Sequence, residues 1–307
     1  MDDRILRDQP HRDKVIVITG ASSGFGKGVA RKFAAAGASL VLAARRMNLL
    51  EDLARECDAL GSRAYPIETD VSNKTAIENL TNETVSRLGR IDIWINNAGV
   101  GAYGRFHSMP LEDHVKVITT DLLGTVFGSY FAVRHFTAKG RGTLINVASE
   151  VGKIPLAFLA SYSAAKHGVV GLTSAIRQEL REAGAKDIHV CTVMPSAMDT
   201  PFFEHASNYT GHQTIPPEPL YNPQEVVDAI FDLATNPRDE VVVGAAGKRA
   251  VFLHGIVPGR VEEMAARSNF KAVFEDAPPG PATRGSVAHP MQSGTEVTGG
   301  WRNPGSN

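Results

Sequence analysis

The segment KVIVITGASSGFGKGVARKF, residues 14–33, decides the fold class of this chain. It begins with a short β-branched run that ends at Gly20, a pattern typical of a buried strand. From residue 26 the pattern becomes that of a helix. The turn between them holds Gly20, Gly24 and Gly26, and glycine permits the positive φ angles that tight turns need. The segment therefore predicts a strand, a glycine turn and a helix in direct succession.

The same alternation of strand and helix continues to about residue 244. Apolar runs such as VIVI and LVLAA indicate strands buried on both faces, as parallel strands are. Parallel strands need crossover connections, and the intervening helices supply them. We expect one α/β domain with a doubly wound, mostly parallel, Rossmann-like sheet between two helix layers. The predicted strands are 14–20, 39–46, 63–70, 91–99, 142–150, 187–195 and 240–244, and the predicted helices are 26–37, 48–60, 73–89, 111–136, 160–184 and 225–235.

Segments outside this alternation complete the predicted organisation. Residues 1–13 form an N-terminal arm, residues 14–248 the Rossmann-like domain, and residues 196–222 a lid inside it. Residues 249–276 are amphipathic and predict a helical extension that packs on the lid, extends an interface or touches a membrane surface. Residues 277–307 are rich in proline and glycine, so we expect a mobile tail, with docking through Trp301 as the alternative.

The composition excludes several classes of protein. The chain has 307 residues, is 43% hydrophobic and 21% charged, and carries a formal net charge of −1, so nucleic acid is not an expected partner. No apolar run approaches the ~20 residues of a membrane span. The start is charged and lacks the apolar core of a secretory signal, so we expect a cytoplasmic protein. Cys57 and Cys191 are isolated, which argues against a disulfide framework, and His205 and His212 lack the partners of a metal site.

The glycine turn predicts a phosphate-binding site. A helix start offers unpaired N–H groups and a positive dipole end, both suited to the pyrophosphate of a dinucleotide. The spacing G-x3-G-x-G differs from the commoner dinucleotide fingerprint, and a tight turn without a ligand is the alternative. We expect the turn to contact the cofactor through Gly20, Ser22, Ser23, Gly24 and Gly26.

The end of the second strand, Ala43-Ala44-Arg45-Arg46, discriminates between cofactors. NAD sites usually place a carboxylate here for the ribose 2′-hydroxyl, whereas this chain has two arginines. A guanidinium matches a 2′-phosphate in charge and geometry. We therefore predict NADP(H), with Arg45 as the better candidate, Ser22 assisting and Arg46 nearby. The alternative is that both arginines are solvated charges at the start of the next helix.

Two further strand ends predict cofactor contacts, because ligands of open α/β sheets bind at the carboxyl ends of strands. Asp70 and Val71 follow the third strand, where a carboxylate can accept from the adenine amino group or cap the next helix. Asn97, Ala98 and Gly99 close the fourth strand at the same edge.

Ser149, Tyr162 and Lys166 form a candidate catalytic set. Tyr162 and Lys166 stand four residues apart and so share one helix face. A nearby ammonium favours the phenolate and lowers the pKa of a tyrosine, which suits it to proton transfer near neutral pH. Ser149 ends the fifth strand, and its hydroxyl can donate to a substrate oxygen. The alternative is a surface Tyr/Lys pair that arose by chance.

With these motifs in order, the chain resembles the short-chain dehydrogenase/reductase family over residues 14–245, and its AARR segment is similar to the NADP-preferring members. The resemblance implies that Tyr162 is the general acid and base and that Lys166 activates it and binds the ribose. It also implies that Ser149 orients the substrate oxygen and that Thr200, after Pro195, contacts the nicotinamide carboxamide. Finally, it implies pairing of the helices 111–136 and 160–182 into a homodimer or homotetramer.

Two residues depart from the family pattern. The family usually has Asn in the long helix, where its main-chain carbonyl helps to hold a water in a proton relay. This chain has Asp121, whose carboxylate can only accept hydrogen bonds, so we expect turnover to persist with an altered pH profile. Ser196 stands where the family often has Gly after Pro195, beside the nicotinamide.

The lid predicts the substrate class. Its aromatic and aliphatic residues suit a lipophilic or aromatic ketone, aldehyde or alcohol, or else they only anchor the lid. An NADP-dependent oxidoreductase is the leading hypothesis for the function. A lyase or epimerase with an internally recycled nucleotide and a non-catalytic NADP-sensing module are the alternatives. The expected apolar pocket residues are Phe202, Phe203, Tyr209, Ile215, Tyr103, Phe106, Leu156 and Phe158.

Overall fold

Seven parallel strands form the central sheet of the computed structural model, which describes residues 11–302. The strand order is β3-β2-β1-β4-β6-β7-β9, so the chain starts in the middle and winds outward in both directions. This order confirms the doubly wound sheet that the sequence predicts. The strands are β1 (Val15–Thr19), β2 (Ser39–Ala44), β3 (Arg63–Glu68), β4 (Ile93–Asn96), β6 (Gly142–Val147), β7 (Ile188–Pro195) and β9 (Glu240–Val243).

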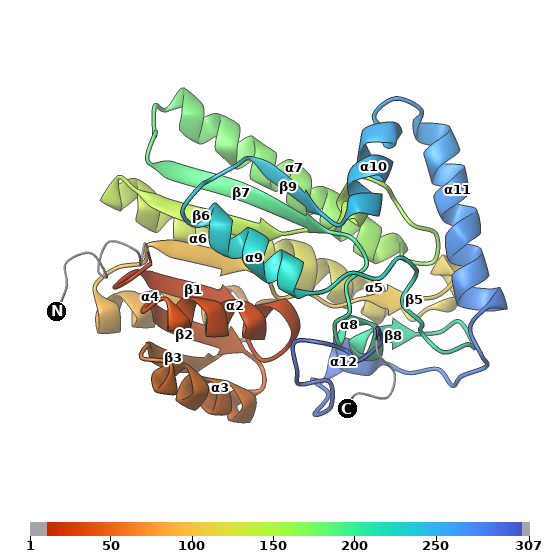
Figure 1. Cartoon of the computed structure of the whole chain (residues 1–307), viewed down its shortest axis with the longest axis horizontal. Helices are drawn as coiled ribbons and strands as arrows, with labels where there is room; N and C mark the ends of the chain where they lie inside the picture. Colours follow the sequence, from red (N-terminus) through yellow and green to blue (C-terminus); the bar gives the residue numbers. More distant parts are fainter. Residues whose placement is uncertain (1–10, 303–307) are drawn as a thin grey trace.

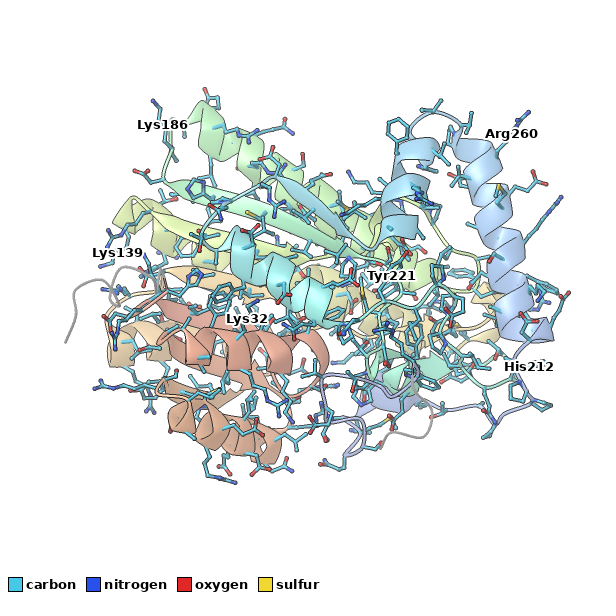
Figure 2. The ribbon with its side chains drawn as sticks, viewed as in Figure 1. Lys32, Lys139, Lys186, His212, Tyr221 and Arg260 are labelled. Carbon is cyan, nitrogen blue, oxygen red and sulfur yellow. The ribbon has the colours of Figure 1, made fainter. Side chains whose placement is uncertain are left out.

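Helices cover both faces of the sheet and enclose two apolar cores. One face packs against α2 (Gly24–Ala35), α3 (Met47–Ala59) and α9 (Gln224–Leu233), which lie in front of the sheet (Figure 1). The other face packs against α4 (Lys74–Leu88), α6 (Gly124–Lys139) and α7 (Ala160–Glu182). Side chains of successive β1 residues point to opposite faces of the sheet. Ile16 and Ile18 therefore belong to the first core and Val17 to the second. Charged side chains such as Lys139 and Lys186 point outward (Figure 2).

The predicted long helix 111–136 is interrupted. It consists of α5 (Leu111–Ile118), a π-helical turn at Thr119–Leu123, and α6. The turn contains Asp121, which is fully buried. Directly after this turn, Gly124 packs against the loop that follows β3. A Cβ added at Gly124 would lie only 2.8 Å from Val71 Cγ2. Single π turns occur often at functional sites, because they redirect the side chains that they carry.

The lid and the helical extension pack at the carboxyl edge of the sheet. The lid region contributes α8 (Phe202–His205) and β8 (Ser207–Asn208), which pairs with β5 (Ala102–Tyr103). The extension forms a hairpin of α10 (Ala245–His254) and α11 (Pro258–Phe270) that rises beside the body (Figure 1). None of the helices within residues 11–302 has the length and apolarity needed to cross a membrane. Short elements complete the chain: the 3₁₀ turns Phe106–Ser108 and Glu150–Gly152, a π turn at Lys271–Glu275, and α12 (Gly285–Ala288).

The C-terminal segment differs from the mobile tail that the sequence predicts for 277–307. In the structure, residues 277–302 lie against the carboxyl edge of the sheet, beside α8 and β8 (Figure 1). Val287 is fully buried and packs with Val100 and Met109. The backbone N–H of Trp301 donates to Asp199, which matches the alternative of docking through Trp301. Composition misses this because the segment is held by a few buried residues, namely Ala277, Ser286 and Val287, and by hydrogen bonds and ion pairs to distant parts of the chain. Residues 1–10 of the predicted arm and 303–307 of the tail lie outside the described residues.

Candidate active site

One cavity at the carboxyl edge of the sheet gathers most of the predicted site residues. Because these residues come from the ends of six strands and from the start of α7, only the tertiary fold brings them together. Two predicted residues, Gly26 and Asp121, are not among the lining residues. They contact residues that do line the cavity, Gly20 and Lys166 respectively. The predicted residues that line the cavity are Gly20, Ser22, Ser23, Gly24, Arg45, Arg46, Asp70, Val71, Asn97, Ala98, Gly99, Ser149, Tyr162, Lys166, Pro195 and Thr200.

The glycine turn has the shape of a phosphate cradle. Gly24 has a φ of +54°, and a Cβ there would meet nothing nearer than Thr200 Cβ at 4.0 Å, so a ligand can approach the backbone closely. Gly26 has a different role, since its Cβ would meet the Gly20 carbonyl oxygen at 2.3 Å. Gly26 therefore allows the helix to pack against the strand end, while the open side of Gly24 fits the pyrophosphate of a dinucleotide.

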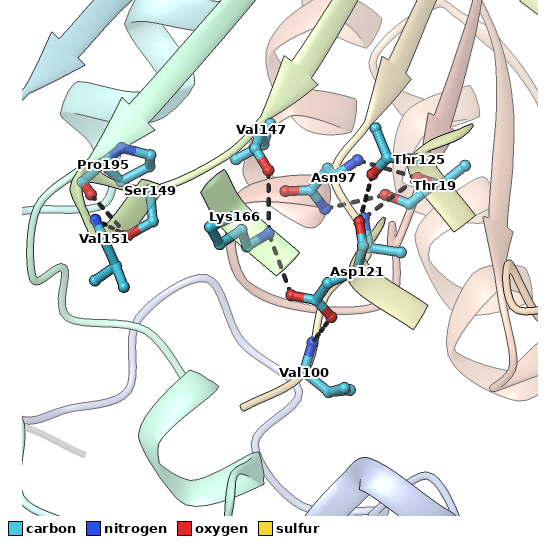
Figure 3. A network of polar contacts seen from close by, with 11 residues as sticks. Thr19, Asn97, Val100, Asp121, Thr125, Val147, Ser149, Val151, Lys166 and Pro195 are labelled. Carbon is cyan, nitrogen blue, oxygen red and sulfur yellow. Dashed lines mark hydrogen bonds and ion pairs between the residues drawn. The ribbon is translucent and has the colours of Figure 1, made fainter. Parts of the chain in front are cut away.

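Asn97 joins the glycine turn to the end of β4. Its Nδ2 donates to the carbonyl oxygens of Thr19 and Gly20 at 3.0 and 3.2 Å (Figure 3). In return Thr19 Oγ1 accepts the N–H groups of Asn97 and Ala98 at 3.0 and 3.2 Å. Sequence reasoning missed Thr19, although its place directly before Gly20 is a usable signal. These bonds hold the turn in the conformation that a phosphate requires.

The two arginines after β2 have different surroundings. Arg46 is 7% exposed and donates to the hydroxyls of Ser22 and Ser23 at 2.9 and 2.8 Å. Arg45 is less buried, and its Nη2 donates to the Ser286 carbonyl at 2.7 Å. Burial lowers the pKa of both groups. The sequence predicts that Ser22 assists Arg45, but in the structure Ser22 binds Arg46, whose fork spans both serines.

Asp70 caps the turn that follows β3. Its Oδ1 accepts the N–H and the hydroxyl of Ser72 at 2.9 and 2.7 Å, and Lys116 Nζ lies 3.3 Å from its Oδ2. Burial raises the pKa of Asp70, but the Ser72 hydrogen bonds and the Lys116 charge outweigh it, so the pKa is lowered. A carboxylate that stays ionised remains an acceptor for an amino group on the side that lines the cavity.

Ser149, Tyr162 and Lys166 all line the cavity. Ser149 begins a 3₁₀ turn, where its Oγ accepts the Val151 N–H at 3.2 Å and donates to the Pro195 carbonyl at 3.4 Å (Figure 3). Tyr162 and Lys166 lie one turn apart near the start of α7, with Lys166 Nζ 5.4 Å from the centroid of the Tyr162 ring. The structure thus brings together the three residues that the sequence separates.

Asp121 lies behind Lys166 and forms a buried ion pair with it. Its Oδ2 is 3.3 Å from Lys166 Nζ, which also donates to the Val147 carbonyl at 3.2 Å (Figure 3). Its Oδ1 accepts the Val100 N–H at 2.8 Å, and its main-chain carbonyl accepts the Thr125 hydroxyl at 2.7 Å. Burial raises the pKa of Asp121, although the Lys166 charge opposes the shift.

The pKa of Tyr162 differs from the sequence expectation. Burial raises it, the negative charge of Asp121 raises it further, and the Ser149 hydroxyl acts in the opposite direction. The sequence leads us to expect that Lys166 lowers this pKa. The difference has a physical cause: the charge of Lys166 is compensated by the carboxylate that it contacts.

The substrate end of the cavity is mostly apolar. Of the aromatic and aliphatic residues predicted there, Tyr103, Leu156, Phe202 and Phe203 line the cavity. Four others do not: Phe106, Phe158, Tyr209 and Ile215. Phe106 is 67% exposed, and the Tyr209 hydroxyl donates to Asp113, so these two face elsewhere. The lining residues that sequence reasoning missed include Glu150, Leu159, Met198 and Asn269.

Within residues 11–302, no three His, Cys, Asp or Glu side chains gather in a group that could hold a metal ion.

Comparison with known proteins covers the predicted cofactor-binding and catalytic residues, which lie between Gly20 and Thr200. The family model described as short chain dehydrogenase matches residues 14–210. The chain is 33% identical over 272 residues to the uncharacterized oxidoreductase YxnA of Bacillus subtilis. The aligned region covers 88% of this chain and 76% of YxnA. It is 30% identical over 240 residues to the 3-oxoacyl-[acyl-carrier-protein] reductase FabG of Thermotoga maritima. The aligned region covers 76% of this chain and 96% of FabG.

Solved structures share the fold. A short chain dehydrogenase/reductase from Burkholderia phymatum in complex with NAD superposes with a TM-score of 0.73 at 24% identity, over 81% of this chain and 96% of that one. A metagenomic short-chain oxidoreductase in complex with NADP superposes with a TM-score of 0.63 at 30% identity, over 76% of this chain and 97% of that one.

Proposed function

Because the chain belongs to the short-chain dehydrogenase/reductase family, whose members are oxidoreductases of alcohols and carbonyls, we propose that it is an NADP(H)-dependent carbonyl reductase or alcohol dehydrogenase with Tyr162 as its general acid and base. The observation that carries this proposal is that Ser149, Tyr162 and Lys166 line the same cavity as the glycine turn. A proton donor and a dinucleotide cradle in one cavity support hydride transfer.

The residues present fit a nicotinamide dinucleotide. The glycine turn and Ser23 would hold the pyrophosphate, Asp70 and Val71 the adenine, and Asn97 to Gly99 the adjacent ribose edge. Lys166 would bind the nicotinamide ribose, while Pro195 and Thr200 would contact the carboxamide. When bound, the nicotinamide supplies or accepts the hydride.

The preference for NADP(H) rests on Arg45, since solved relatives hold NAD in one case and NADP in the other. Arg45 lines the cavity after β2, where no carboxylate is present to bind a free 2′-hydroxyl. Its guanidinium has five N–H groups, and one of them donates to Ser286, which leaves it suited to a phosphate.

The proton follows a short path in the proposed reduction. Ser149 donates a hydrogen bond to the substrate carbonyl oxygen and orients it. Tyr162 gives its phenolic proton to the same oxygen as the hydride reaches the carbon, and in the oxidation it takes the proton back. Lys166 holds its ammonium beside the phenol, and Asp121 holds Lys166.

The apolar walls support a lipophilic or aromatic substrate. Phe202 lies 5.3 Å from Tyr162 between ring centroids, and Phe203 and Leu156 continue the wall outward. A carbonyl next to an apolar group would bury that group here while its oxygen meets Ser149.

Exposed apolar residues on α5 and α6 support assembly into a homodimer or homotetramer. Leu111 and Val115 on α5 are 69% and 56% exposed, and Tyr130 on α6 is 57% exposed. Light scattering of the purified chain tests this part of the proposal, and a monomer at micromolar concentration would contradict it.

The test of the function is the oxidation of NADPH and NADH, followed by absorbance, with a panel of aromatic and aliphatic ketones, aldehydes and quinones. We expect NADPH-selective turnover that falls about 10²- to 10⁴-fold in Tyr162→Phe. Tyr65→Phe is the matched control, because Tyr65 lies in β3 and is not among the lining residues of the cavity. Nucleotide binding without turnover, unchanged by Tyr162→Phe, would overturn the proposal.

A further inference from the structure

The chain closes over its own cavity with the segment 285–302, here named the C-terminal strap. The strap begins at α12 and runs past the glycine turn to the Thr200 segment. Ser286 and Pro290 of the strap line the cavity itself. Figure 1 shows this end of the chain beside α8 and near the start of α2. The strap therefore forms part of the outer wall of the proposed dinucleotide site.

Arg46 joins the strap to the glycine turn. On one side its guanidinium donates to Ser22 and Ser23, and on the other its Nη1 donates to the carbonyls of Met291 and Ser293 at 2.9 and 3.4 Å. Together with the bond from its Nε to the Ser22 hydroxyl at 3.1 Å, these bonds occupy all five N–H donors of the guanidinium. Arg46 thus connects the glycine turn to the strap by hydrogen bonds. This role differs from the cofactor contact that the sequence predicts for Arg46.

The start of α2 provides a second attachment. The Gly24 N–H donates to the Glu296 carbonyl at 2.9 Å, so the strap holds one of the N–H groups at a helix start that suits a phosphate. The Glu296 carboxylate lies 2.9 Å from Lys27 Nζ and 3.6 Å from the Arg31 guanidinium. Lys27 is 8% exposed, and it also donates to the Thr295 carbonyl at 3.2 Å.

Asp199 provides the third attachment, next to Thr200. Its carboxylate accepts the N–H groups of Gly299 and Trp301 at 3.1 and 2.9 Å. The Trp301 indole donates to the Thr200 carbonyl at 3.3 Å. The strap is therefore tied both to the glycine turn and to the Thr200 segment, the two parts of the site that the proposed dinucleotide would contact.

The two ends of the strap are held differently. Val287 in α12 is fully buried in the apolar cluster around Val100 and Met109, and this anchors its beginning. Beyond Pro290 the strap is held by hydrogen bonds, by ion pairs of Glu296, whose side chain is 62% exposed, and by the partly buried Trp301, whose ring centroid lies 6.5 Å from that of Phe203. Hydrogen bonds and exposed ion pairs exchange readily for water or for a phosphate, whereas a buried valine does not.

From this arrangement we propose that residues 291–302 are a gate over the dinucleotide site, which swings away from the anchor at Val287 for cofactor binding and release. The gate rests on the proposed function, since it presupposes that the cavity takes a nicotinamide dinucleotide. While closed, it slows both the association and the dissociation of the cofactor, because each requires the attachments at Arg46, Glu296 and Asp199 to break.

Stopped-flow measurement of NADPH fluorescence tests the gate. Two variants open it: a chain that ends at Pro290, which keeps α12 and Val287, and Glu296→Gln in the full chain. The matched control is Glu263→Gln, since Glu263 is also 62% exposed and pairs with Arg267 on α11, away from the strap. We expect both rate constants to rise at least about tenfold in the shortened chain and severalfold in Glu296→Gln, with no change in Glu263→Gln.

Two results overturn the gate. Unchanged association and dissociation rates in both variants show that the strap does not control access. A faster dissociation with unchanged association shows that the strap is only a contact of the bound cofactor. If neither NADPH nor NADH binds any of these chains in equilibrium dialysis, the proposed function fails and the gate with it. Should the shortened chain not fold, Glu296→Gln alone decides between the outcomes.

Discussion

The Lys166 ammonium and the Asp121 carboxylate form an ion pair, with Nζ 3.3 Å from Oδ2, and the two side chains are 5% and 0% exposed. In such a buried place the lysine charge acts first on the carboxylate that it contacts. The phenol of Tyr162 therefore stands beside a nearly neutral pair rather than beside a lone cation. Burial of the phenol and the charge of Asp121 together raise the pKa of the proposed catalytic tyrosine.

Replacement of Asp121 by Asn shifts the pH profile toward lower pH. The Asp121 charge raises the pKa of Tyr162, so its removal lowers that pKa, and Lys166 without its counter-charge lowers it further. In the reduction Tyr162 must carry its proton, so activity falls off at a lower pH in the variant. In the oxidation the phenolate is needed, so activity rises from a lower pH. Profiles of kcat/KM in both directions measure the shift, and superimposable profiles would refute it.

Substitutions of Arg45 and Arg46 are expected to have different effects, because Arg45 would set the preference for NADP(H) whereas Arg46 attaches the strap. Arg45→Asp is expected to raise the Kd for NADPH by about 10- to 100-fold, as the loss of a charged hydrogen bond implies, while the Kd for NADH changes little. Arg46→Lys loses the fork that joins Ser22, Ser23 and the strap, so it alters binding of both cofactors alike. Fluorescence titration measures the four constants. Equal losses of NADPH and NADH in Arg45→Asp would remove the 2′-phosphate assignment.

Alanine substitutions at Gly152 and Gly171, in or next to α7, are expected to change the free energy of unfolding in opposite directions. A Cβ at Gly152 would meet the Lys166 carbonyl oxygen at 2.7 Å, so Gly152→Ala is expected to cost about 1–3 kcal/mol and to disturb the catalytic lysine. A Cβ at Gly171 in α7 meets nothing within 4 Å, so Gly171→Ala is expected to add about 0.5–1 kcal/mol through helix propensity. Urea unfolding provides both values. A neutral Gly152→Ala would mean that the backbone at Lys166 yields easily.

The two cysteines are expected to be inert in the folded protein. Cys57 and Cys191 are 0% and 1% exposed, and burial raises the pKa of Cys57 to about 12 and that of Cys191 to about 11. Since the thiolate is the reactive form, iodoacetamide at pH 8 should leave both unmodified for hours and label both at once in urea. Mass spectrometry counts the adducts. Rapid labelling of either cysteine without denaturant would show that the core around it opens locally.

The sheet and the catalytic trio could be predicted because their signals are local. β-branched runs, the glycine turn and the spacing of Tyr162 and Lys166 each lie within a few residues, and the strand order then follows from crossover connections. The π turn at Thr119–Leu123 left no such signal, since one additional residue per turn does not interrupt the helical pattern of the segment. For the same reason the sequence showed Asp121 as a substitution but not as the partner of Lys166.

The sequence by itself determined the fold class and indicated the glycine turn and the trio of Ser149, Tyr162 and Lys166 as candidate site residues, because strand, turn and helix preferences are properties of neighbouring residues. Only the tertiary structure decided how Arg45 and Arg46 divide their contacts, how Lys166 meets Asp121, and where residues 277–302 lie. Arg46 and Met291, for example, are separated by 245 positions, and their bond exists because the sheet edge brings both chain segments to one place. Hydrogen bonds and ion pairs across such separations depend on distance in space, which no local pattern of residues records.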